Sequence, residues 1–487
     1  MIEFIKLSFS YKESAKGSLR EVHLDIPKGQ CVLLCGASGC GKTTLTRLVN
    51  GLIPHFFEGS LSGKVTVGGM NVAETEISTL SDSVGTVFQN PRTQFFNTDT
   101  DSEIVFGLEN RMLEPEKLRQ QLEIVTNDLH IEKLRGRNIF ELSGGEKQKI
   151  AFASVYAANP DIFVLDEPSS NLDFHSVLEL KKLIERIKQQ GKTIIIAEHR
   201  LWYLIEIADR VLLMKAGQIF KDMSMQDFCR LPVKQIRNMG LRCRNFSEIA
   251  TNTDDKKISD HTLELKDIHV KYGEKTILQN ISFTANGGEI VAITGANGAG
   301  KTTLARTICG LLKQKSGNIF TDGINLTAKA RIEKSYMVMQ DVGHQLFTDS
   351  VKTECTLGTK TQNDTHVDET LSMLSLAELK DRHPLSLSGG QKQRLAVAIS
   401  LLCDKEILIF DEPTSGLDLK SMREVGALIE RLSAQGKILL VITHDIEFIK
   451  TICSRVLLLS GGKIIADLKG EEKEDIENYV LAGGDRA

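Results

Sequence analysis

The sequence predicts an α/β fold in two copies, each with a mostly parallel sheet core, an antiparallel β edge and a helical subdomain. Three observations support this prediction: a length of 487 residues, an internal repeat, and short apolar runs that alternate with helical stretches. One hydrophobic core does not grow efficiently to this size, so two or more domains are expected. Strands that alternate with helices form a mostly parallel sheet joined by right-handed crossovers.

The internal repeat relates the two halves of the chain. The paired segments are GASGCGKTTL (36–45) and GANGAGKTTL (295–304), LSGGEKQK (142–149) and LSGGQKQR (387–394), and IFVLDEPSSNLD (162–173) and ILIFDEPTSGLD (407–418). The offset is 259 residues from Lys42 to Lys301 but 245 from Ser143 to Ser388, so the first copy carries 14 additional residues between these points. The repeat therefore indicates one duplicated domain, because each copy is large enough to bury its own core.

The repeat also sets the expected domain bounds. The first copy ends near Phe228, and the second begins with a strand-like segment at Leu263. We predict domains at 1–228 and 263–487, joined by a linker at 229–262. The linker ends in the polar run ATNTDDKKISDHT, which favours a solvated segment.

Composition and charge narrow the class of protein. The chain is 41% hydrophobic and 25% charged, with a formal net charge of -4, which argues against a surface dominated by nucleic-acid binding. No apolar run is long enough to cross a bilayer, and the N-terminus lacks the regions of a signal peptide, so we expect the cytosol. The nine cysteines are scattered without a C-x-x-C pair, which predicts free thiols in a reducing compartment.

Apolar runs mark the predicted strands. The runs CVLLC and EIVAIT each precede a glycine-rich loop, and IFVLD, ILIFD, TIIIAEH and ILLVITH follow later in the two copies. Such short runs fit strands that are buried on both faces of a parallel sheet. By contrast, EFIKLSFSY and LELKDIHVKY alternate apolar and polar residues, which predicts antiparallel strands at the edge of each domain.

Both glycine-rich loops have the P-loop pattern G-x-x-x-x-G-K-T, starting at Gly36 and Gly295. The glycines let backbone N–H groups face phosphates at a helix N-terminus, the lysine neutralises the β and γ oxygens, and the threonine hydroxyl can ligate Mg²⁺. The predicted ATP-binding residues of these loops are Gly36, Ala37, Ser38, Gly39, Cys40, Gly41, Lys42, Thr43, Thr44, Gly295, Ala296, Asn297, Gly298, Ala299, Gly300, Lys301, Thr302 and Thr303. We expect ATP and Mg²⁺ as the cofactors, the loops predicting the phosphate and Mg²⁺ contacts and the resemblance given below implying ATP as the nucleotide.

An acidic pair ends a later apolar run in each copy, Asp166-Glu167 and Asp411-Glu412. A carboxylate at a strand end can hold the magnesium shell, and the adjacent glutamate can polarise an attacking water. Acidic pairs at strand ends are usually surface charge. Here their order and spacing behind a P-loop favour catalysis.

These motifs resemble the ATP-binding-cassette (ABC) superfamily over nearly the whole chain. The resemblance rests on the P-loop, the LSGG segment, the apolar run ending in Asp-Glu, and a downstream histidine, all present twice. It implies two P-loop NTPase ATP-binding-cassette domains that pack head to tail and bury two ATP molecules between them. Site one would combine Lys42, Thr43, Gln89, Asp166, Glu167 and His199 with Ser388, Gly389 and Gly390. Site two would combine Lys301, Thr302, Gln340, Asp411, Glu412 and His444 with Ser143, Gly144 and Gly145.

The resemblance also implies roles for individual residues. The catalytic residues would be Glu167, Glu412, His199 and His444, and the magnesium ligands Thr43, Gln89, Asp166, Thr302, Gln340 and Asp411. Both sites are expected to hydrolyse ATP, because neither lacks a consensus residue. Asp173 and Asp418 would lie at the interface between the domains. Tyr11 and Tyr272 could stack on adenine, with a packing role as a serious alternative.

Cys40 lies inside the first P-loop, where the second copy has Ala299. Any small residue fits such a position. The more specific hypothesis is that the helix N-terminus activates the thiol, so that alkylation blocks site one and ATP protects it.

The segments 88–110 and 339–354 place a second glutamine five residues after Gln89 and Gln340. Together with AEHRLWYL at 197–204, they resemble the ATPases of energy-coupling factor (ECF) transporters. The resemblance implies import of vitamins or metal ions, at the cytoplasmic face of the cell membrane, with a transmembrane energising subunit and a small substrate-capture subunit as partners. The alternatives are another ABC importer, for example of sugars, or a soluble ribosome-associated factor.

Aromatic residues after each glutamine could form a groove for a partner helix. The candidates are Phe95, Phe96, Leu346 and Phe347, and core packing of the helical subdomain explains them about equally well. Nearby acidic residues could receive basic partner side chains, although a solvated face is the commoner explanation. They are Asp99, Asp101, Glu103 and Asp349.

Overall fold

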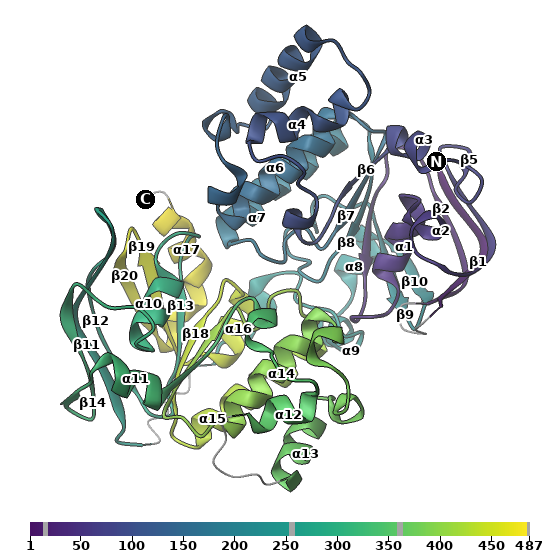
Figure 1. Ribbon diagram of the computed structural model, residues 1–487. Coiled ribbons are helices and arrows are strands. Elements are labelled where there is room, and N and C mark those ends of the chain that lie inside the picture. The colour runs from purple at the N-terminus through teal and green to yellow at the C-terminus, as the bar shows by residue number, and fades with distance from the viewer. Residues whose placement is uncertain (13–17, 253–258, 358–363, 485–487) are drawn as a thin grey trace. The chain divides into compact units, whose positions relative to one another are not determined.

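The computed structural model describes residues 1–12, 18–252, 259–357 and 364–484 (Figure 1). The chain divides into two compact units. The first unit is Met1–Leu172 with Ser176–Glu248, and the second is Ile249–Ala487 with Asp173–His175. Each unit contains a four-stranded antiparallel sheet and a six-stranded, mostly parallel sheet. The predicted duplicated α/β fold is therefore confirmed.

The first unit begins with the antiparallel sheet, in the order β2-β1-β4-β5. Its strands are β1 (Ile2–Tyr11), β2 (Leu19–Ile26), β4 (Gly59–Val67) and β5 (Met70–Asn71). The larger sheet has the order β10-β9-β3-β8-β7-β6, and all its neighbouring pairs are parallel except β10 with β9. Its strands are β3 (Cys31–Cys35), β6 (Val84–Val87), β7 (Ile162–Asp166), β8 (Thr193–Ala197), β9 (Arg210–Lys215) and β10 (Gln218–Ser224).

The helices of the first unit fall into two groups. A helical subdomain consists of α4 (Thr100–Glu109), α5 (Pro115–Asp128) and α6 (Gly144–Ala157), which pack on one another (Figure 1). The remaining helices are α1 (Lys42–Val49), α2 (Leu52–His55), α3 (Ile77–Ser83), α7 (Phe174–Gln189), α8 (Met225–Arg230) and α9 (Val233–Asn238). The short helix α2 is part of the additional length of the first copy, because the second unit has no helix between α10 (Lys301–Ile308) and β14 (Ser316–Thr321).

Successive side chains of a strand point to opposite faces of the sheet, so the buried strands contribute to two cores, one on each face of the parallel sheet. In β3, Cys31, Leu33 and Cys35 join a core that also holds the helical subdomain. Val32 and Leu34 point the other way, into the core shared with α1 and the antiparallel sheet. All five residues of β3 are buried, as expected for a strand covered on both faces.

The second unit repeats this plan. Its antiparallel sheet, in the order β12-β11-β14-β15, contains β11 (Thr262–Tyr272), β12 (Lys275–Asn286), β14 (Ser316–Thr321) and β15 (Ile324–Asn325). The larger sheet, in the order β16-β17-β18-β13-β19-β20, contains β13 (Ile290–Thr294), β16 (Ser335–Val338), β17 (Ile407–Asp411), β18 (Ile438–Ile442), β19 (Arg455–Ser460) and β20 (Lys463–Lys469). The helices are α10 (Lys301–Ile308), α11 (Ala328–Lys334), α12 (Val351–Thr356), α13 (Asp364–Met373), α14 (Gly389–Leu402), α15 (Leu419–Ala434), α16 (Ile446–Ile452) and α17 (Ile476–Gly484).

The segment predicted as a linker, 229–262, begins with residues that pack on the first unit. Ile236 and Leu241 are buried in its core, and Arg244 donates to the carbonyl of Phe228 at 2.9 Å. The boundary between the two units falls after Glu248, inside the predicted linker, and the domain bounds stay a prediction. Of the polar run predicted to be solvated, residues 253–258 lie outside the described residues.

Two further features bear on the class of protein. Among the described residues, no helix combines the length and apolarity that a membrane span requires. All nine cysteines are free thiols, as their scattered spacing predicts.

Candidate functional site

The two P-loops turn from a buried strand into a helix in the same way. In the first unit β3 ends at Cys35 and α1 starts at Lys42, with Gly41 in the left-handed conformation at φ 107°. At Gly36 a Cβ atom would lie 2.3 Å from the carbonyl oxygen of Met214, and at Gly295 it would lie 2.0 Å from that of Leu459. Only glycine fits where the loop passes so close to the neighbouring strand.

The P-loop lysines are buried and point back into their own loops. Lys42 Nζ donates to the carbonyl of Gly36 at 3.0 Å, and Lys301 Nζ donates to that of Gly295 at 2.7 Å. Burial lowers the pKa of Lys301, while the negative charges of Glu412 and Asp411 oppose that shift. A buried ammonium group among loop carbonyls is placed to bind phosphate oxygens.

A hydroxyl and a carboxylate meet where magnesium is expected. Thr43 Oγ1 donates to Asp166 Oδ1 at 3.4 Å, and Thr302 Oγ1 donates to Asp411 Oδ2 at 2.9 Å. Burial, and then the charge of Glu167, raises the pKa of Asp166 to about 6. Burial likewise raises the pKa of Asp411. Hard oxygen donors of this kind are the ligands that Mg²⁺ prefers, and a divalent cation would favour the ionised carboxylates, so the residues fit this metal.

The glutamates after these strands contact the histidines that the sequence pairs with them. Glu167 Oε1 lies 3.3 Å from His199 Nε2, and Glu412 Oε1 lies 3.3 Å from His444 Nε2. In the first unit Gln89 Nε2 also donates to Glu167 Oε2 at 2.7 Å, and this leaves the Gln89 carbonyl oxygen as the group that could face a metal. Gln340, its counterpart, is exposed beyond the end of β16.

Both glutamates adopt a backbone conformation that the sequence does not reveal. The φ angle is 47° at Glu167 and 53° at Glu412, in the left-handed region that residues other than glycine rarely occupy. Each amide donates to the next strand, to the carbonyl of Ala197 or Ile442, at 2.8 Å. This hydrogen bond holds a strained conformation, a feature that clusters at functional sites.

The LSGG serines cap the long helices α6 and α14. Ser143 Oγ accepts from the amide of Glu146, whose carboxylate accepts from the amide of Ser143. Ser388 and Gln391 form the same capping box in the second unit. The glycines that follow, Gly144, Gly145, Gly389 and Gly390, lie in the first turns of the two helices. Pairing of each LSGG segment with the other unit's P-loop stays a prediction.

Tyr11 and Tyr272 lie in different surroundings. The hydroxyl of Tyr11 lies 3.2 Å from Thr44 Oγ1 and accepts from Arg47 NH1 at 3.1 Å, and its ring packs edge-on against Phe9. Tyr272 is 48% exposed. Packing therefore accounts for Tyr11, and adenine stacking stays a prediction for both tyrosines.

Sequence reasoning missed a cation–π pair beside the first P-loop. The guanidinium of Arg47 lies 4.0 Å from the ring centre of Phe57, a residue of the additional segment of the first copy. Both line a cavity of about 230 Å³ that also contacts Thr43, Gln89 and Asp166. The spacing of Phe57 from the P-loop carries no motif that could have identified it.

The second glutamine of each segment 88–110 and 339–354 has a structural role. Gln94 accepts from the amide of Phe88 and donates to the carbonyl of Thr86, at 3.4 and 3.2 Å. Gln345 makes the equivalent contacts with the amide of Met339 and the carbonyl of Met337, both at 2.7 Å. These side chains fold each loop back onto the end of the strand before it. In the first unit the folded loop also carries Gln89, which contacts Glu167.

The groove candidates divide into core and surface residues. Leu346 is buried, so a groove role for it is wrong. Phe95 is partly buried against the core of the first unit, and its groove role stays a prediction. Phe96 and Phe347 are 77% and 76% exposed.

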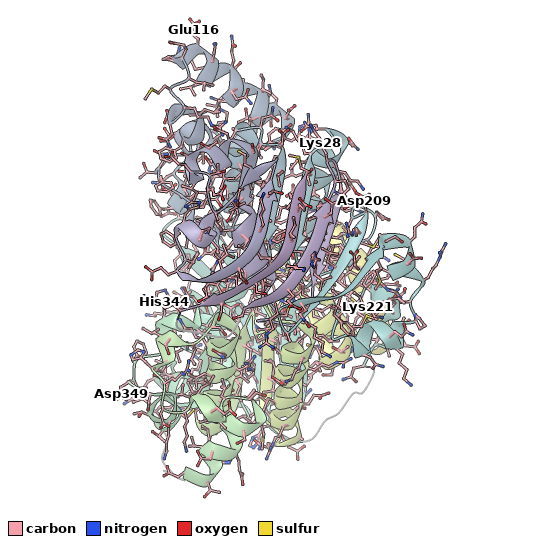
Figure 2. The ribbon with its side chains drawn as sticks, turned by 90° about the vertical axis from the view of Figure 1, so that its right-hand side faces the viewer. Lys28, Glu116, Asp209, Lys221, His344 and Asp349 are labelled. Carbon is pink, nitrogen blue, oxygen red and sulfur yellow. The ribbon has the colours of Figure 1, made fainter. Side chains whose placement is uncertain are left out.

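The acidic candidates near the groove divide in the same way. Glu103 is buried and accepts from the amides of Phe96 and Asn97, while Asp99 caps α4 and Asp101 pairs with Arg135. Only Asp349 of the four acidic candidates is exposed (Figure 2) without such a described contact.

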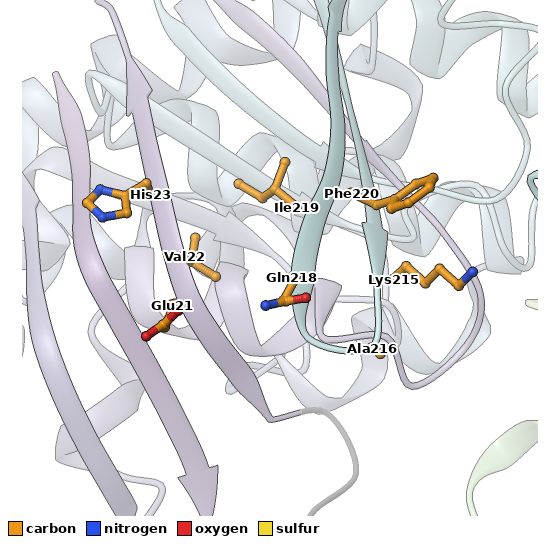
Figure 3. A pocket seen from close by; sticks show the side chains of 8 residues that line it. All are labelled: Glu21, Val22, His23, Lys215, Ala216, Gln218, Ile219 and Phe220. Atoms are coloured by element: carbon orange, nitrogen blue, oxygen red, sulfur yellow. The ribbon is translucent and has the colours of Figure 1, made fainter.

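A larger hollow of about 560 Å³ lies between β2 and the β9–β10 hairpin of the first unit. Figure 3 shows Glu21 and His23 on β2 across from Gln218 on β10, with Lys215 at the hairpin. None of the predicted site residues lines it. Placement of the nucleotide chemistry at the P-loop edge of each parallel sheet stays a prediction.

Comparison with known proteins bears on the family of the chain. The family model described as ABC transporter matches residues 19–170 and 278–415, which together exceed half of the chain. A protein of Treponema denticola, named for an ABC transporter ATP-binding role, is 66% identical over 98% of this chain and 99% of its own length. YkoD of Bacillus subtilis, named for HMP/thiamine import, is 32% identical over 93% of this chain and 89% of its own length.

Two solved structures share the fold over 98% of the chain. One is a model of ribosome-bound archaeal Pelota and ABCE1, with a TM-score of 0.72, 23% identity and 80% of that chain covered. The other is the RNase-L inhibitor, with a TM-score of 0.67, 21% identity and 93% of that chain covered. At this identity the likeness establishes the fold alone.

Proposed function

The chain belongs to the ABC transporter family of ATPases, and we propose that its ATP hydrolysis powers import of a vitamin-like micronutrient or a metal ion through a transporter of the ECF type. In this proposal the chain binds the cytoplasmic face of the cell membrane. Its partners are a transmembrane energising subunit and a small membrane protein that captures the substrate.

Within each cassette the described residues divide the work of hydrolysis. The P-loop amides and the buried lysine hold the phosphates of ATP. Thr43 and Asp166 in the first cassette, and their counterparts in the second, would hold the magnesium ion that neutralises phosphate charge. Glu167 orients and polarises the attacking water, and His199, 3.3 Å away, fixes the carboxylate of Glu167.

We further propose that each ATP is completed by the LSGG segment of the other cassette. Ser143 and Ser388 cap helices of 14 residues, whose first amides are suited to bind an anion. Hydrolysis then removes the ligand that holds the cassettes together, so a chemical step becomes a mechanical one.

Exposed apolar residues carry the proposal of a membrane partner. Phe96 and Phe347 occupy the same position, seven residues after Gln89 and Gln340, in the two cassettes. Phe140 and Leu385, 245 residues apart, form a second exposed pair, 74% and 51% accessible. Large apolar side chains exposed at equivalent places in both cassettes suit two similar amphipathic helices of one partner.

Buried carboxylates fix the loops that present these side chains. Glu354 Oε2 accepts from the amides of Phe347 and Thr348 at 2.9 and 2.8 Å, as Glu103 does in the first cassette for Phe96 and Asn97. A rigid loop beside the glutamine that touches Glu167 can transmit closure of the nucleotide site to a bound helix.

The test is a pull-down from native membranes with the Glu167→Gln/Glu412→Gln variant, in mild detergent with ATP. Recovery of one multi-span protein with small hydrophobic companions supports the proposal. A matched variant that adds Phe96→Ser and Phe347→Ser should bind ATP normally and lose these partners. Recovery of ribosomes without a membrane protein, or of the same partners by the serine variant, contradicts it.

A further inference from the structure

A buried carboxylate in the first cassette joins the catalytic histidine to the loop after the catalytic glutamate. Glu198 is 2% exposed and lies at the end of β8, next to His199. Its Oε1 accepts from the amides of His199 and Arg200, at 2.6 and 3.1 Å. Its Oε2 accepts from Ser169 Oγ at 2.7 Å and from the amide of Ser169 at 3.3 Å.

Tyr203 supplies a further donor to this carboxylate. Its hydroxyl donates to Glu198 Oε2 at 2.9 Å, and the tyrosine is fully buried. Burial, and then the charge of Glu198, raises the pKa of Tyr203 well above its usual range, so the hydroxyl keeps its proton. Five donors therefore surround one buried carboxylate, which is the condition for burying it ionised.

Arg200 holds the same loop from its carbonyl side. Arg200 is 8% exposed, and its NH1 donates to the carbonyls of Ser169 and Leu172 at 3.1 and 3.2 Å. The loop 169–172 follows Glu167, and the amide of Ser170 donates to the Glu167 carbonyl. Glu198 and Arg200 flank His199 in the chain. Glu198 thus accepts hydrogen bonds from the loop 169–172, and Arg200 donates hydrogen bonds to it.

The second cassette has different residues at these positions. Thr443 and Asp445 flank His444, where the first cassette has Glu198 and Arg200. Thr414 Oγ1 donates to Asp445 Oδ2 at 3.1 Å, and Thr443 Oγ1 lies 3.5 Å from Glu412 Oε2. In the second cassette the carboxylate that contacts the loop belongs to Asp445, the residue after the histidine. Neither Thr443 nor Asp445 is a basic residue, so the arginine of the first cassette has no counterpart here.

We propose that Glu198 and Arg200 are positioning residues that make His199 and the loop 169–172 one rigid body. They would thereby keep the contact between Glu167 and His199 constant during turnover. The two cassettes of the chain thus brace the same catalytic pair in two different ways. A charged, hydrogen-bonded network of this kind is sensitive to loss of any member, because the groups left behind stay buried.

The test measures ATP hydrolysis by the purified full chain. Glu198→Gln keeps the shape of the side chain but replaces one carboxylate oxygen with an NH₂ group. The two N–H donors of that group would face other hydrogen-bond donors. We expect kcat to fall about tenfold with an unchanged KM for ATP, because the lysine and P-loop are untouched. The double variant Glu198→Thr/Arg200→Asp, which copies the second cassette, should restore kcat to within about twofold of the parent chain.

A matched control separates positioning from folding. Arg210→Met breaks an ion pair with Asp222 elsewhere in the first unit, and should lower the melting temperature without changing kcat per folded molecule. If Glu198→Gln does not fold, Ser169→Ala and Tyr203→Phe each remove one donor and should lower kcat at constant KM. The proposal is overturned if Glu198→Gln folds and leaves kcat unchanged. If Glu198→Gln does not fold, it is overturned when Ser169→Ala and Tyr203→Phe both leave kcat unchanged. It is also overturned if kcat falls in Glu198→Gln and Glu198→Thr/Arg200→Asp does not restore it. These outcomes do not depend on a membrane partner, so they leave the import proposal untouched.

Discussion

The buried carboxylate of Asp166 lowers the stability of the folded chain, and replacing Asp166 with asparagine should measure that loss. Burial raises the pKa of this carboxyl from 3.8 to about 6 in the folded chain. A shift of about 2 units corresponds to roughly 3 kcal/mol of folding free energy. The folded state binds the proton more tightly than the unfolded state, so this penalty is fully present above about pH 6 and disappears below about pH 4.

Asp166→Asn should therefore stabilise the nucleotide-free chain at about pH 7.5, by at most about 3 kcal/mol, or several degrees in melting temperature. The asparagine oxygen can still accept the hydrogen bond from Thr43, so the gain comes from removing the buried charge. The gain should shrink as the pH falls through about 6. Magnesium with ATP should stabilise the parent chain more than the variant, because the cation compensates the buried charge only where the carboxylate is present.

Calorimetry of the two chains between about pH 5 and pH 8 is the assay. The exposed carboxylate Glu74 gives a matched control, since Glu74→Gln should leave the melting temperature unchanged at every pH. If the Asn variant melted at or below the parent chain at about pH 7.5, burial would not be the cause of the raised pKa, and the reasoning would be refuted.

Three further outcomes are expected. We expect the two sites to hydrolyse ATP only in cooperation, so Glu167→Gln alone should lower ATP turnover about 100-fold or more while ATP still binds. If Glu167→Gln and Glu412→Gln each left half of the turnover, this cooperation would be refuted. Gly36→Ala places a Cβ atom 2.3 Å from a carbonyl oxygen and should abolish ATP binding, while Gly39→Ala meets nothing within 4 Å and should weaken it far less, as measured by nucleotide titration. Cys40 is 6% exposed, so its alkylation by N-ethylmaleimide should be slow, and slower still with ATP. If mass spectrometry found Cys40 unmodified while the reagent removed activity, this thiol would be excluded as the target.

Contiguous motifs made the nucleotide-binding residues predictable. A P-loop is a run of eight residues whose backbone amides bind phosphate, so its chemistry is encoded locally, and the repeat doubles the evidence. The acidic pairs and histidines were also found, because each follows a buried strand whose composition is distinctive. The described contacts bring Lys42, Thr43, Gln89, Asp166, Glu167 and His199 together in the first unit through pairwise distances of 2.7 to 3.4 Å.

Neighbouring loop residues were not separable in the same way. Phe95 is partly buried against the core and Phe96 is exposed, yet both are phenylalanines in a segment that is neither helix nor strand. Without a period of 2 or 3.6 residues, a sequence does not tell which of two adjacent side chains points inward. Glu103 was misjudged for another reason: it lies in α4 and has the charge of a surface residue, but it is buried, and the amides of Phe96 and Asn97 satisfy its carboxylate.

By itself the sequence determined the duplicated α/β fold, the two P-loops and the class of ATPase, because each of these is encoded in contiguous motifs that the repeat presents twice. Only the tertiary structure decided the left-handed conformation of Glu167, the raised pKa of Asp166, and the network that joins Glu198 to Ser169. These depend on burial and on partners far apart in the sequence, and no local pattern encodes which side chains a folded core brings together or how much water it removes from them.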